Sequence, residues 1–390
     1  MRQGLLFLLV VVCLVAARAE AFPWMIRHGY ASCATCHHDP SGGALLTPYG
    51  RAQSELLLAA RYGKQKEEEE VSPTTAFLLG AVTLPDWLNL GLSFRGGGLV
   101  TRAGDDTDVR PLQMVSDLRA NIAVGPVRAG GSVGFVARGA RFAALTNFEE
   151  NNVVSREHWL GLANEDQTLL LRAGRMTLPF GLRTVEHTLW ARQLTRTDHN
   201  EQQQHGVALA YNIEGLRTEV MAILGNFQLH PDLYRERGYS GYVEWAPFTR
   251  AAFGVSSLLT HARYDVVTKR PSFLRQAHGV FARVAPVKPL VFLLEADVLL
   301  DRPEGGPLAS GYTGLLQVDY ELKQGFHLLA TAEVLQRPGV HVTALGGWLS
   351  FDYFILPQLE VRLDAILSHP GQSAPEPNVL SLLGQLRLSL

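Results

Sequence analysis

From residue 73 onward, apolar and polar side chains alternate along the chain with a period of two. In the final stretch, 378–390, polar residues share one face and leucines the other, with Leu383 as the exception on the polar face. In 359–367, the polar face carries Glu360, Arg362 and Asp364 together with Ile366. Successive side chains of a strand point to opposite faces, so this period predicts strands that are apolar on one side only.

Sixteen segments have this strand character, and most are long enough to cross a membrane. A tilted spanning strand needs about 9–11 residues, whereas strands of soluble domains are more often about 5–6 residues long. The predicted strands are 87–99, 112–124, 127–138, 154–163, 167–176, 205–213, 216–225, 237–246, 250–260, 274–285, 288–299, 310–322, 325–335, 341–352, 357–367 and 378–390.

Two architectures fit one-sided strands: a soluble sandwich and a membrane barrel with an outward apolar face. Aromatic residues stand at or near many strand ends, where barrels carry interfacial girdles, and the chain ends inside its last strand. These are Trp87, Tyr211, Tyr242, Trp245, Tyr320, Trp348 and Tyr353. We therefore expect a mainly β protein, an outer-membrane antiparallel β-barrel of about 16 strands.

Composition excludes several other classes. With 47% hydrophobic and 18% charged residues the chain is not disordered. Its 35 Lys and Arg against 37 Asp and Glu give no basic field, so no nucleic-acid partner is expected. The mean hydropathy of +0.05 is intermediate because apolar residues are needed only at alternate positions of a barrel strand.

The first 21 residues read as a secretory signal. Leu5 to Ala17 is an apolar run of 13 residues, and Ala19-Glu20-Ala21 is a small-residue cleavage pattern. The run is shorter than the 18 or more residues of a spanning helix. We expect cleavage after Ala21, export, and the outer membrane as the destination.

The two cysteines of the exported chain lie in Cys33-Ala34-Thr35-Cys36-His37, the attachment pattern of c-type haem. Two thiols at this spacing can form thioethers with both vinyl groups of one haem edge, and His37 follows as the proximal iron ligand. A zinc site would need four ligands, and a redox pair would need a surrounding βαβ unit. The sequence thus predicts one covalent haem c on Cys33 and Cys36, with His37 on the iron.

The sixth iron ligand is less defined by the sequence. His28 precedes Cys33 by five residues and can fold back, so it is the first candidate, with Met25 the second. His38 directly follows the proximal ligand, which makes the opposite haem face hard to reach. The identity of this ligand changes the reduction potential.

The haem segment is predicted to be short. A single amphipathic helix is expected over 51–62, followed by a charged linker that includes Lys64 to Glu70. This gives three parts: a signal peptide at 1–21, a monohaem cytochrome c segment of α and coil structure at 22–72, and the barrel at 73–390.

The longest irregular stretch is 177–204, for which two interpretations stay open. It could fold inward and shape the pore or contact the haem segment, or it could be an exposed loop of ordinary polar content. Its charged and imidazole side chains are Arg183, His187, Arg192, Arg196 and His199.

In layout the chain resembles the fused monohaem cytochrome–porin family of bacterial outer membranes, whose best-known members are implicated in iron(II) oxidation. The matching residues are Cys33, Cys36 and His37, the segment Leu46 to Arg51, and the stretch GRMTLPFGLR at 174–183. The resemblance implies an electron route across the outer membrane. Its partners would be outer-membrane lipid, a periplasmic electron carrier, and an external electron donor or acceptor, with iron(II) among the candidates.

Two alternatives to the electron route remain. The first is a solute porin with a small regulatory or plug-like haem segment, and the second is a soluble exported β protein with a haem-binding sensor segment. A conventional hydrolase is disfavoured because no nucleophile motif accompanies the His and Asp residues. We expect an electron-transfer protein rather than a conventional enzyme.

Overall fold

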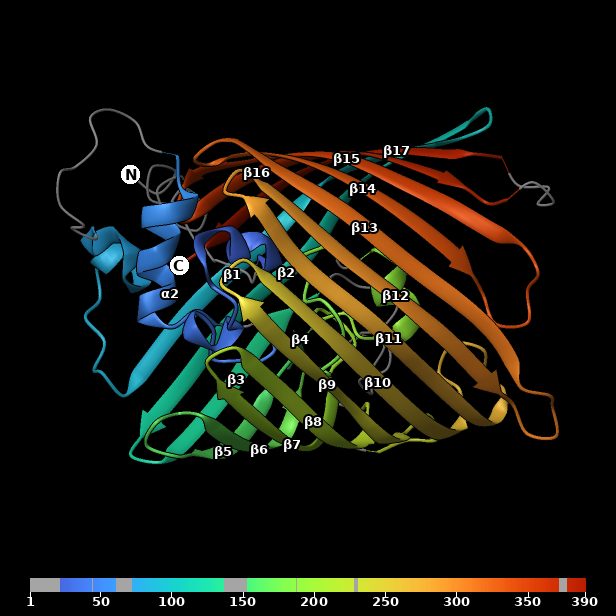
Figure 1. The fold of residues 1–390 in the computed structure, drawn as a ribbon, viewed down its shortest axis with the longest axis horizontal. Coiled ribbons are helices and arrows are strands. Elements are labelled where there is room, and N and C mark those ends of the chain that lie inside the picture. The colour runs from blue at the N-terminus through green and yellow to red at the C-terminus, as the bar shows by residue number, and fades with distance from the viewer. Residues whose placement is uncertain are drawn as a thin grey trace, which may run out of the picture.

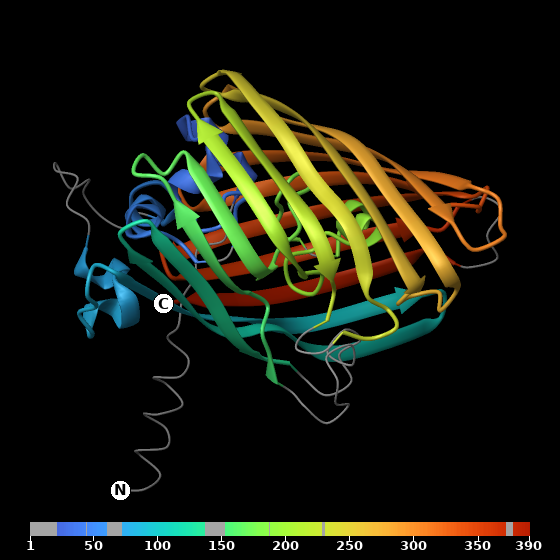
Figure 2. The same ribbon diagram turned by 90° about the horizontal axis from the view of Figure 1, so that it is seen from below.

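The computed structural model describes residues 22–43, 45–60, 72–136, 153–186, 188–227, 231–371 and 377–390. These residues form one closed β-barrel with a small helical segment at one end (Figures 1 and 2). Among them, no helix is long and apolar enough to cross a membrane.

Helical structure is confined to short pieces. The 3₁₀ turns are Pro23–His28, Cys33–Thr35, Pro73–Thr75 and Phe77–Gly80; the α-helices are α2 (Pro48–Gln53) and α3 (Trp190–Thr195); a π-helical turn covers Ser54–Leu58.

The strands account for most of the chain from residue 88 onward. They are β1 (Leu88–Ala103), β2 (Asp106–Val124), β3 (Val127–Phe135), β4 (Val153–Val154), β5 (His158–Ala163), β6 (Leu169–Met176), β7 (Gln204–Ile213), β8 (Leu216–Gly225), β9 (Glu236–Phe248), β10 (Ala251–Tyr264), β11 (Pro271–Val287), β12 (Leu290–Arg302), β13 (Ala309–Lys323), β14 (Phe326–Gln336), β15 (Thr343–Leu356), β16 (Leu359–His369) and β17 (Val379–Ser389).

Each strand pairs antiparallel with its neighbour in the sequence, and β1 pairs with β17 to close the ring. The two-residue β4 pairs only at the end of β3, and β3 continues the ring by pairing with β5. Without β4, the seventeen strands of the sheet leave sixteen in the ring. The predicted antiparallel barrel and its sixteen strands are confirmed.

The two faces of the wall have the polarity of a membrane barrel. On β12, Leu294 and Val298 lie outward and are 41% and 50% exposed, whereas Glu295 and Asp297 point into the lumen and are 3% and 2% exposed. The same alternation runs around the ring, with charged residues inside and aliphatic residues outside. This inverts the arrangement of a soluble sandwich and places an apolar belt against lipid.

Two of the residues proposed as girdle aromatics were assigned wrongly. Trp87, Trp245 and Tyr320 are exposed on the outer face, in agreement with the expectation. Tyr242 and Trp348 are 4% and 8% exposed, because their places in the alternation turn their rings into the lumen. Closeness to a strand end alone does not tell the two faces apart.

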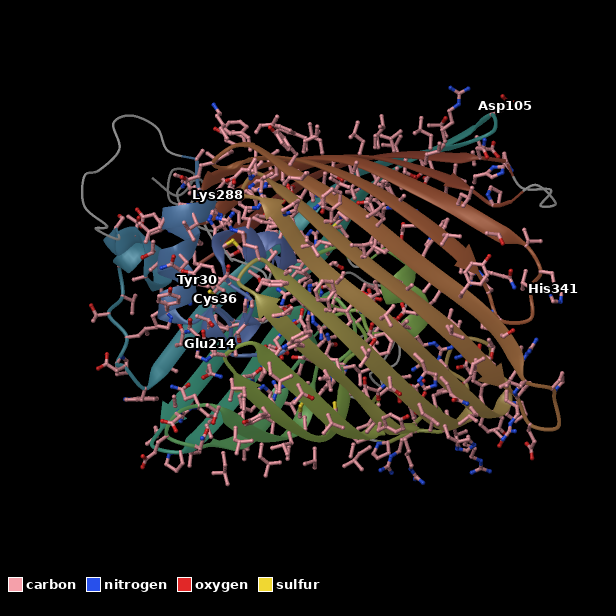
Figure 3. All side chains as sticks on the ribbon, viewed as in Figure 1. Tyr30, Cys36, Asp105, Glu214, Lys288 and His341 are labelled. Carbon is pink, nitrogen blue, oxygen red and sulfur yellow. The ribbon has the colours of Figure 1, made fainter. Side chains whose placement is uncertain are left out.

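The two ends of the barrel differ in the length of their connections. At one end, turns of two residues join β2 to β3, β7 to β8, β9 to β10, β11 to β12, β13 to β14 and β15 to β16; the longest connection at the other end covers 177–203. Figure 3 shows Glu214 and Lys288 at the short-turn end and Asp105 and His341 at the opposite one. Bacterial barrels keep short turns on the periplasmic side, so we assign the short-turn end to the periplasm.

The predicted helix over 51–62 begins earlier and is broken. Pro48 opens α2 at the first helical position, and the Thr47 hydroxyl accepts a hydrogen bond from the amide of Gly50 at 3.0 Å. The chain then widens into the π-helical turn that ends at Leu58. The end of the predicted helix, at 61–62, lies outside the described residues.

The segment 177–204 folds inward, which decides between the two interpretations of it. Arg183 and Arg192 are 5% and 2% exposed inside the barrel, and Leu189 is fully buried. Helix α3 lies within the ring of strands (Figure 2). Of the two interpretations left open, the inward fold is correct and the exposed loop is wrong, so this segment partly fills the lumen.

The direction of the wall's side chains gives a first prediction. Leu363 lies outward near the middle of β16 and Leu367 lies outward near its end. In urea unfolding from lipid vesicles, Leu363→Arg should lower the free energy of unfolding by about 2–4 kcal/mol and Leu367→Arg by about 0–1 kcal/mol, because burying a cation costs most at the bilayer midplane. Equal losses would contradict the assigned membrane position.

Candidate functional site

The Cys-x-x-Cys-His sequence forms one tight turn. Cys33 begins a 3₁₀ turn, and its carbonyl accepts hydrogen bonds from the amides of Cys36 at 3.1 Å and His37 at 3.0 Å. His37 then pairs with Leu46 in an isolated antiparallel bridge, and the Thr47 amide donates to the Cys36 carbonyl at 2.9 Å. The turn brings the two cysteines and the histidine to one place.

These residues line a pocket of about 50 Å³. Apolar and small residues form most of its wall. The lining residues are Phe22, Met25, Tyr30, Ser32, Cys33, Cys36, His37, Leu46, Gly50, Gln53, Ser54, Leu58 and Arg283.

Burial affects the chemistry of the two thiols in the motif. Both cysteines are free and partly buried. Burial raises the pKa of the Cys36 thiol to about 11, with a further contribution from Cys33, so the thiol is neutral at neutral pH. The described residues also contain no group of three or more His, Cys, Asp and Glu placed to hold a metal ion.

The imidazole of His37 is held in the orientation expected of a metal ligand. It is 7% exposed, and its Nδ1 lies 2.8 Å from the carbonyl oxygen of Gly43. A ligating histidine commonly donates its other ring N–H to a backbone carbonyl, which fixes the tautomer and the ring plane. With Nδ1 protonated, Nε2 is the nitrogen that can bind iron.

Gly50 explains how α2 can pack against the motif. A Cβ at this position would stand 2.3 Å from the carbonyl oxygen of Cys36. Only glycine allows this approach, and both Gly50 and Leu46 line the pocket.

The two candidates for the sixth iron position are separated by the fold. Met25 lines the pocket, whereas His28 is not among its lining residues. The Nε2 atom of His28 is buried and has no hydrogen-bond partner among the described residues. Burial lowers the pKa of His28 to about 4, and the charge of Lys288 is the next contribution.

Residues 22–58, which carry the pocket and are here called the pocket segment, are anchored inside the mouth of the barrel by a buried ion pair. Arg27 is fully buried, forms an ion pair with Asp319 of β13, and lies 3.3 Å from Oε2 of Glu321. Its guanidinium stacks 5.1 Å from the centre of the Trp24 ring, and that ring lies 4.4 Å from the ring of His327 on β14. The interaction joins residues almost 300 positions apart in the sequence.

Three more arginines of the interior contact the loop after His37. Arg172 of β6 lies 3.5 Å from Asp39, and Arg217 of β8 lies 3.4 Å from the carbonyl of Pro40. Arg183 belongs to the inward-folded stretch 177–204, here called the inward segment, and donates to the Ser41 hydroxyl at 2.9 Å. An apolar cluster continues these contacts, since Phe22, Trp24 and Leu58 pack with Leu182 and Val185. The pocket segment thus fills the short-turn mouth.

The inward segment is held in turn by the wall on several sides. Arg192 forms an ion pair with Glu295 of β12, and Arg362 of β16 donates to Glu186 at 2.6 Å. Of the other side chains predicted as candidates there, Arg196 donates to Asp265 at 2.6 Å and His199 lies 3.8 Å from Asp198. His187 lies outside the described residues.

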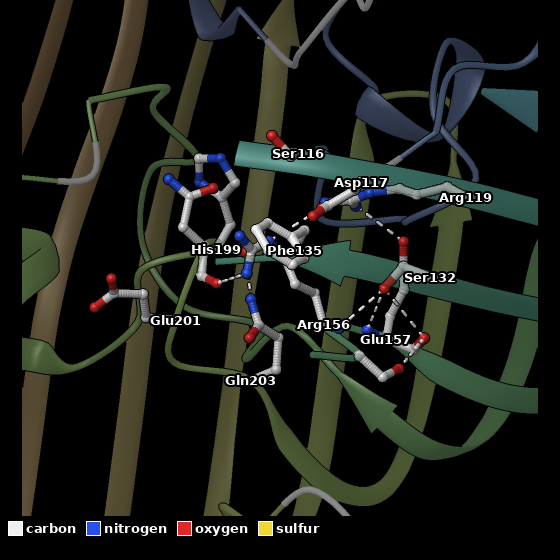
Figure 4. A network of polar contacts seen from close by, with 12 residues as sticks. Ser116, Asp117, Arg119, Ser132, Phe135, Arg156, Glu157, His199, Glu201 and Gln203 are labelled. Carbon is white, nitrogen blue, oxygen red and sulfur yellow. Dashed lines mark hydrogen bonds and ion pairs between the residues drawn. The ribbon is translucent and has the colours of Figure 1, made fainter. Parts of the chain in front are cut away.

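The wall of β2 and β3 carries a further polar network (Figure 4). Arg119 bonds to Asp117 at 3.1 Å and to Glu157 at 2.9 Å. Arg156 lies 3.0 Å from Asp117 and donates to the carbonyl of Asn200 at 2.9 Å. Such pairing is needed because a buried charge without a partner is costly.

No known family profile matches the sequence, and no curated protein matches it. Solved structures do. OmpT, an outer membrane protein of Vibrio cholerae, has a TM-score of 0.59 and 11% identity over 79% of this chain and 100% of its own. The anion-selective porin from Comamonas acidovorans has a TM-score of 0.58 and 12% identity over 78% of this chain and 99% of its own. The outer membrane channel DcaP of Acinetobacter baumannii has a TM-score of 0.53 and 13% identity over 77% of this chain and 97% of its own.

At these identities the likeness concerns the fold. The chain has the barrel fold of outer-membrane porins, and its lipid-facing belt and export signal agree with that location, so the outer membrane is confirmed as its place. The resemblance to fused cytochrome–porins is confirmed only for the porin fold. The haem residues Cys33, Cys36 and His37 and the division at 72/73 stay predictions.

Sequence reasoning missed the residues that hold the pocket in the lumen. Arg27 and Trp24 lie directly before the motif, yet nothing local distinguishes an arginine that meets Asp319 across the barrel from a solvated one. The excess of charge on the inward face of the strands was the only available signal. It indicates a polar lumen but does not assign partners.

The buried Arg27 contact gives a second prediction. Arg27→Ala removes the cation beside Asp319 and Glu321, and losing one partner of a buried pair costs about 3–5 kcal/mol. The free energy of unfolding should fall by about that amount. Protease should also release the N-terminal segment from folded barrels. Arg110→Ala serves as the control, because its pair with Asp108 is 58% and 62% exposed and contributes little. Equal protease resistance of both variants would contradict the anchoring role.

Proposed function

We propose that this protein is an outer-membrane porin-like barrel whose periplasmic mouth holds one covalent haem c, and that it relays electrons between an external donor or acceptor and a periplasmic carrier. The observation that carries the proposal is the pocket lined by Cys33, Cys36, His37 and Met25 inside the barrel mouth. Haem bound there would supply one-electron exchange at its iron.

Each pocket residue has a distinct task in this proposal. The thiols of Cys33 and Cys36 would fix one haem edge through thioethers, and His37 would hold the iron through Nε2. The apolar side chains of Phe22, Leu46 and Leu58 would exclude water from the ring. Exclusion of water and the choice of axial ligand are two of the means by which a protein sets the potential of such a centre.

For the sixth position we favour Met25 over His28. Met25 lines the pocket and needs no rearrangement to face its interior, whereas His28 would have to leave its buried position. A thioether ligand opposite a histidine raises the reduction potential relative to two imidazoles. This reverses the order in which the sequence alone ranked the two residues.

The place of the pocket also limits how electrons could reach it. A bilayer core about 30 Å thick separates the two mouths, and the pocket lies at the short-turn end. An external partner, iron(II) included, would have to enter the lumen from the long-loop side. The pocket segment itself would face the periplasmic carrier.

A second candidate function is a solute porin with a plug-like haem segment. Two observations favour it: the similar structures include an anion-selective porin and an outer membrane channel, and the lumen has cavities of about 430 and 350 Å³ beside the inward segment. The comparisons support this candidate better than they support the electron relay, because none of the named proteins is a cytochrome.

Covalent haem is the first point to test. The protein expressed with a cytochrome c maturation system should retain haem stain after denaturing electrophoresis. Cys36→Ala should lose the stain or keep only a weak stain from the single thioether that Cys33 can form. Ser54→Ala, another pocket position, should keep the stain. Met25→Ala should keep the stain but change the visible spectrum. His28→Ala should keep the stain and leave the visible spectrum unchanged. Wild-type protein without covalent haem would refute the proposal.

The two candidate functions differ in what crosses the barrel. In liposomes that enclose oxidised cytochrome c, an external reductant should reduce the enclosed protein through wild type and much more slowly through Cys36→Ala, in which the haem route is impaired but the plug remains. Swelling in arabinose should be slow for both. Rapid swelling, with equal reduction by the two proteins, would identify a solute porin instead.

A further inference from the structure

Four apolar side chains lie on adjacent strands of the inner face of the barrel and border one cavity. Leu383 and Ile366, which break the alternation in the sequence, both point into the lumen, and Leu99 and Trp348 do the same on the flanking strands. The four residues belong to β15, β16, β17 and β1, which are consecutive in the ring. Leu99 pairs with Leu383, and Trp348 pairs with Ile366. They form one patch, here called the lumenal apolar patch.

The lumenal apolar patch is only partly covered by the chain itself. Leu189 of the inward segment packs with Trp348 and Ile366. The rest of the patch borders a cavity of about 350 Å³, a size typical of small-molecule sites. None of the cavity residues lines the haem pocket.

Two indole rings form part of the cavity wall and are held in place. The Nε1–H of Trp348 donates to Oε2 of Glu333 at 2.8 Å, and the backbone amide of Trp190 donates to Oε1 of the same carboxylate at 2.6 Å. Gly346 makes room for the Trp190 ring, since a Cβ there would lie 3.1 Å from it. Fixed aromatic faces favour a planar aromatic partner in offset stacking.

Polar groups also border the cavity, and they include Arg95, Asn200 and the carboxylates of Glu186, Glu201 and Glu333. Arg95 donates to Gln385 and to the carbonyl of Val185, each at 2.8 Å, and its Nη2 makes no hydrogen bond to the described residues. Asn200 is 3% exposed, and both atoms of its carboxamide lack a partner within the described part of the chain. A guanidinium with an unused donor is suited to an anionic or carbonyl oxygen.

We propose that this cavity binds a small planar aromatic molecule that carries an anionic or carbonyl oxygen, the chemical class of sulfonated or hydroxylated quinones. The lumenal apolar patch and the two indoles receive the ring, and Arg95 receives the oxygen.

The cavity is connected to the haem pocket through the packing of the interior. Val185, whose carbonyl accepts the Arg95 hydrogen bond, belongs to the same cluster as Phe22 and Leu58, which line that pocket. The binding claim stands apart from the haem. Only the consequence that a bound quinone would exchange electrons with the centre rests on the proposed function.

Titration of the detergent-purified protein with 1,4-naphthoquinone-2-sulfonate, followed by tryptophan fluorescence and equilibrium dialysis, tests the site. Wild type should bind saturably. Leu383→Gln places an amide in the lumenal apolar patch and should weaken binding by at least about tenfold. Leu299→Gln is the matched control, since Leu299 is also a buried lumenal leucine but borders the other cavity, and its affinity should stay within about twofold of wild type.

Heat-modifiable migration in electrophoresis confirms that each variant forms a barrel. Should Leu383→Gln not fold, Trp190→Leu replaces it, because Trp190 lies on the inward segment rather than on the wall. Cys36→Ala should bind the probe as wild type does, which separates this site from the haem proposal. The absence of saturable binding to wild type, or equal weakening by the Leu383 and Leu299 substitutions, would overturn the inference.

Discussion

The barrel depends on the pairing of its first strand with its last. β1 and β17 share eleven paired positions, from Ser93 with Ser389 to Ala103 with Val379. A sheet edge in hydrocarbon would leave amide and carbonyl groups without partners, at a cost of several kcal/mol each. Closure removes that edge, and once the ring is closed every strand must present one face to lipid and the other to the lumen.

The closed ring in turn concentrates charge in a confined lumen. Arg27, Arg172, Arg192 and Arg362 are all fully or almost fully buried, and each has a carboxylate partner from a different part of the chain. Burying these arginines unpaired would be prohibitive. The N-terminal segment and the inward segment satisfy this requirement, and in doing so they narrow the channel and place the cysteine-lined pocket in its mouth.

The pocket and the cavity therefore differ in origin. The pocket is built locally, since Cys33, Cys36 and His37 lie on one turn and Gly50 admits α2 beside it. The cavity is built by long-range pairing, because Leu99 meets Leu383 only after the ring has closed. A change in the motif should thus alter chemistry at one mouth without disturbing the wall, whereas a change in strand register would remove the cavity altogether.

The sequence by itself predicted the strands and their number, because a period of two is a local property; the export signal and the haem residues that it also indicates stay predictions. Only the tertiary structure decided that 177–204 folds inward, that Tyr242 and Trp348 face the lumen, and that Met25 rather than His28 lines the pocket. Those outcomes depend on contacts such as Arg27 with Asp319, between residues far apart in the chain, and no local pattern records such a partner.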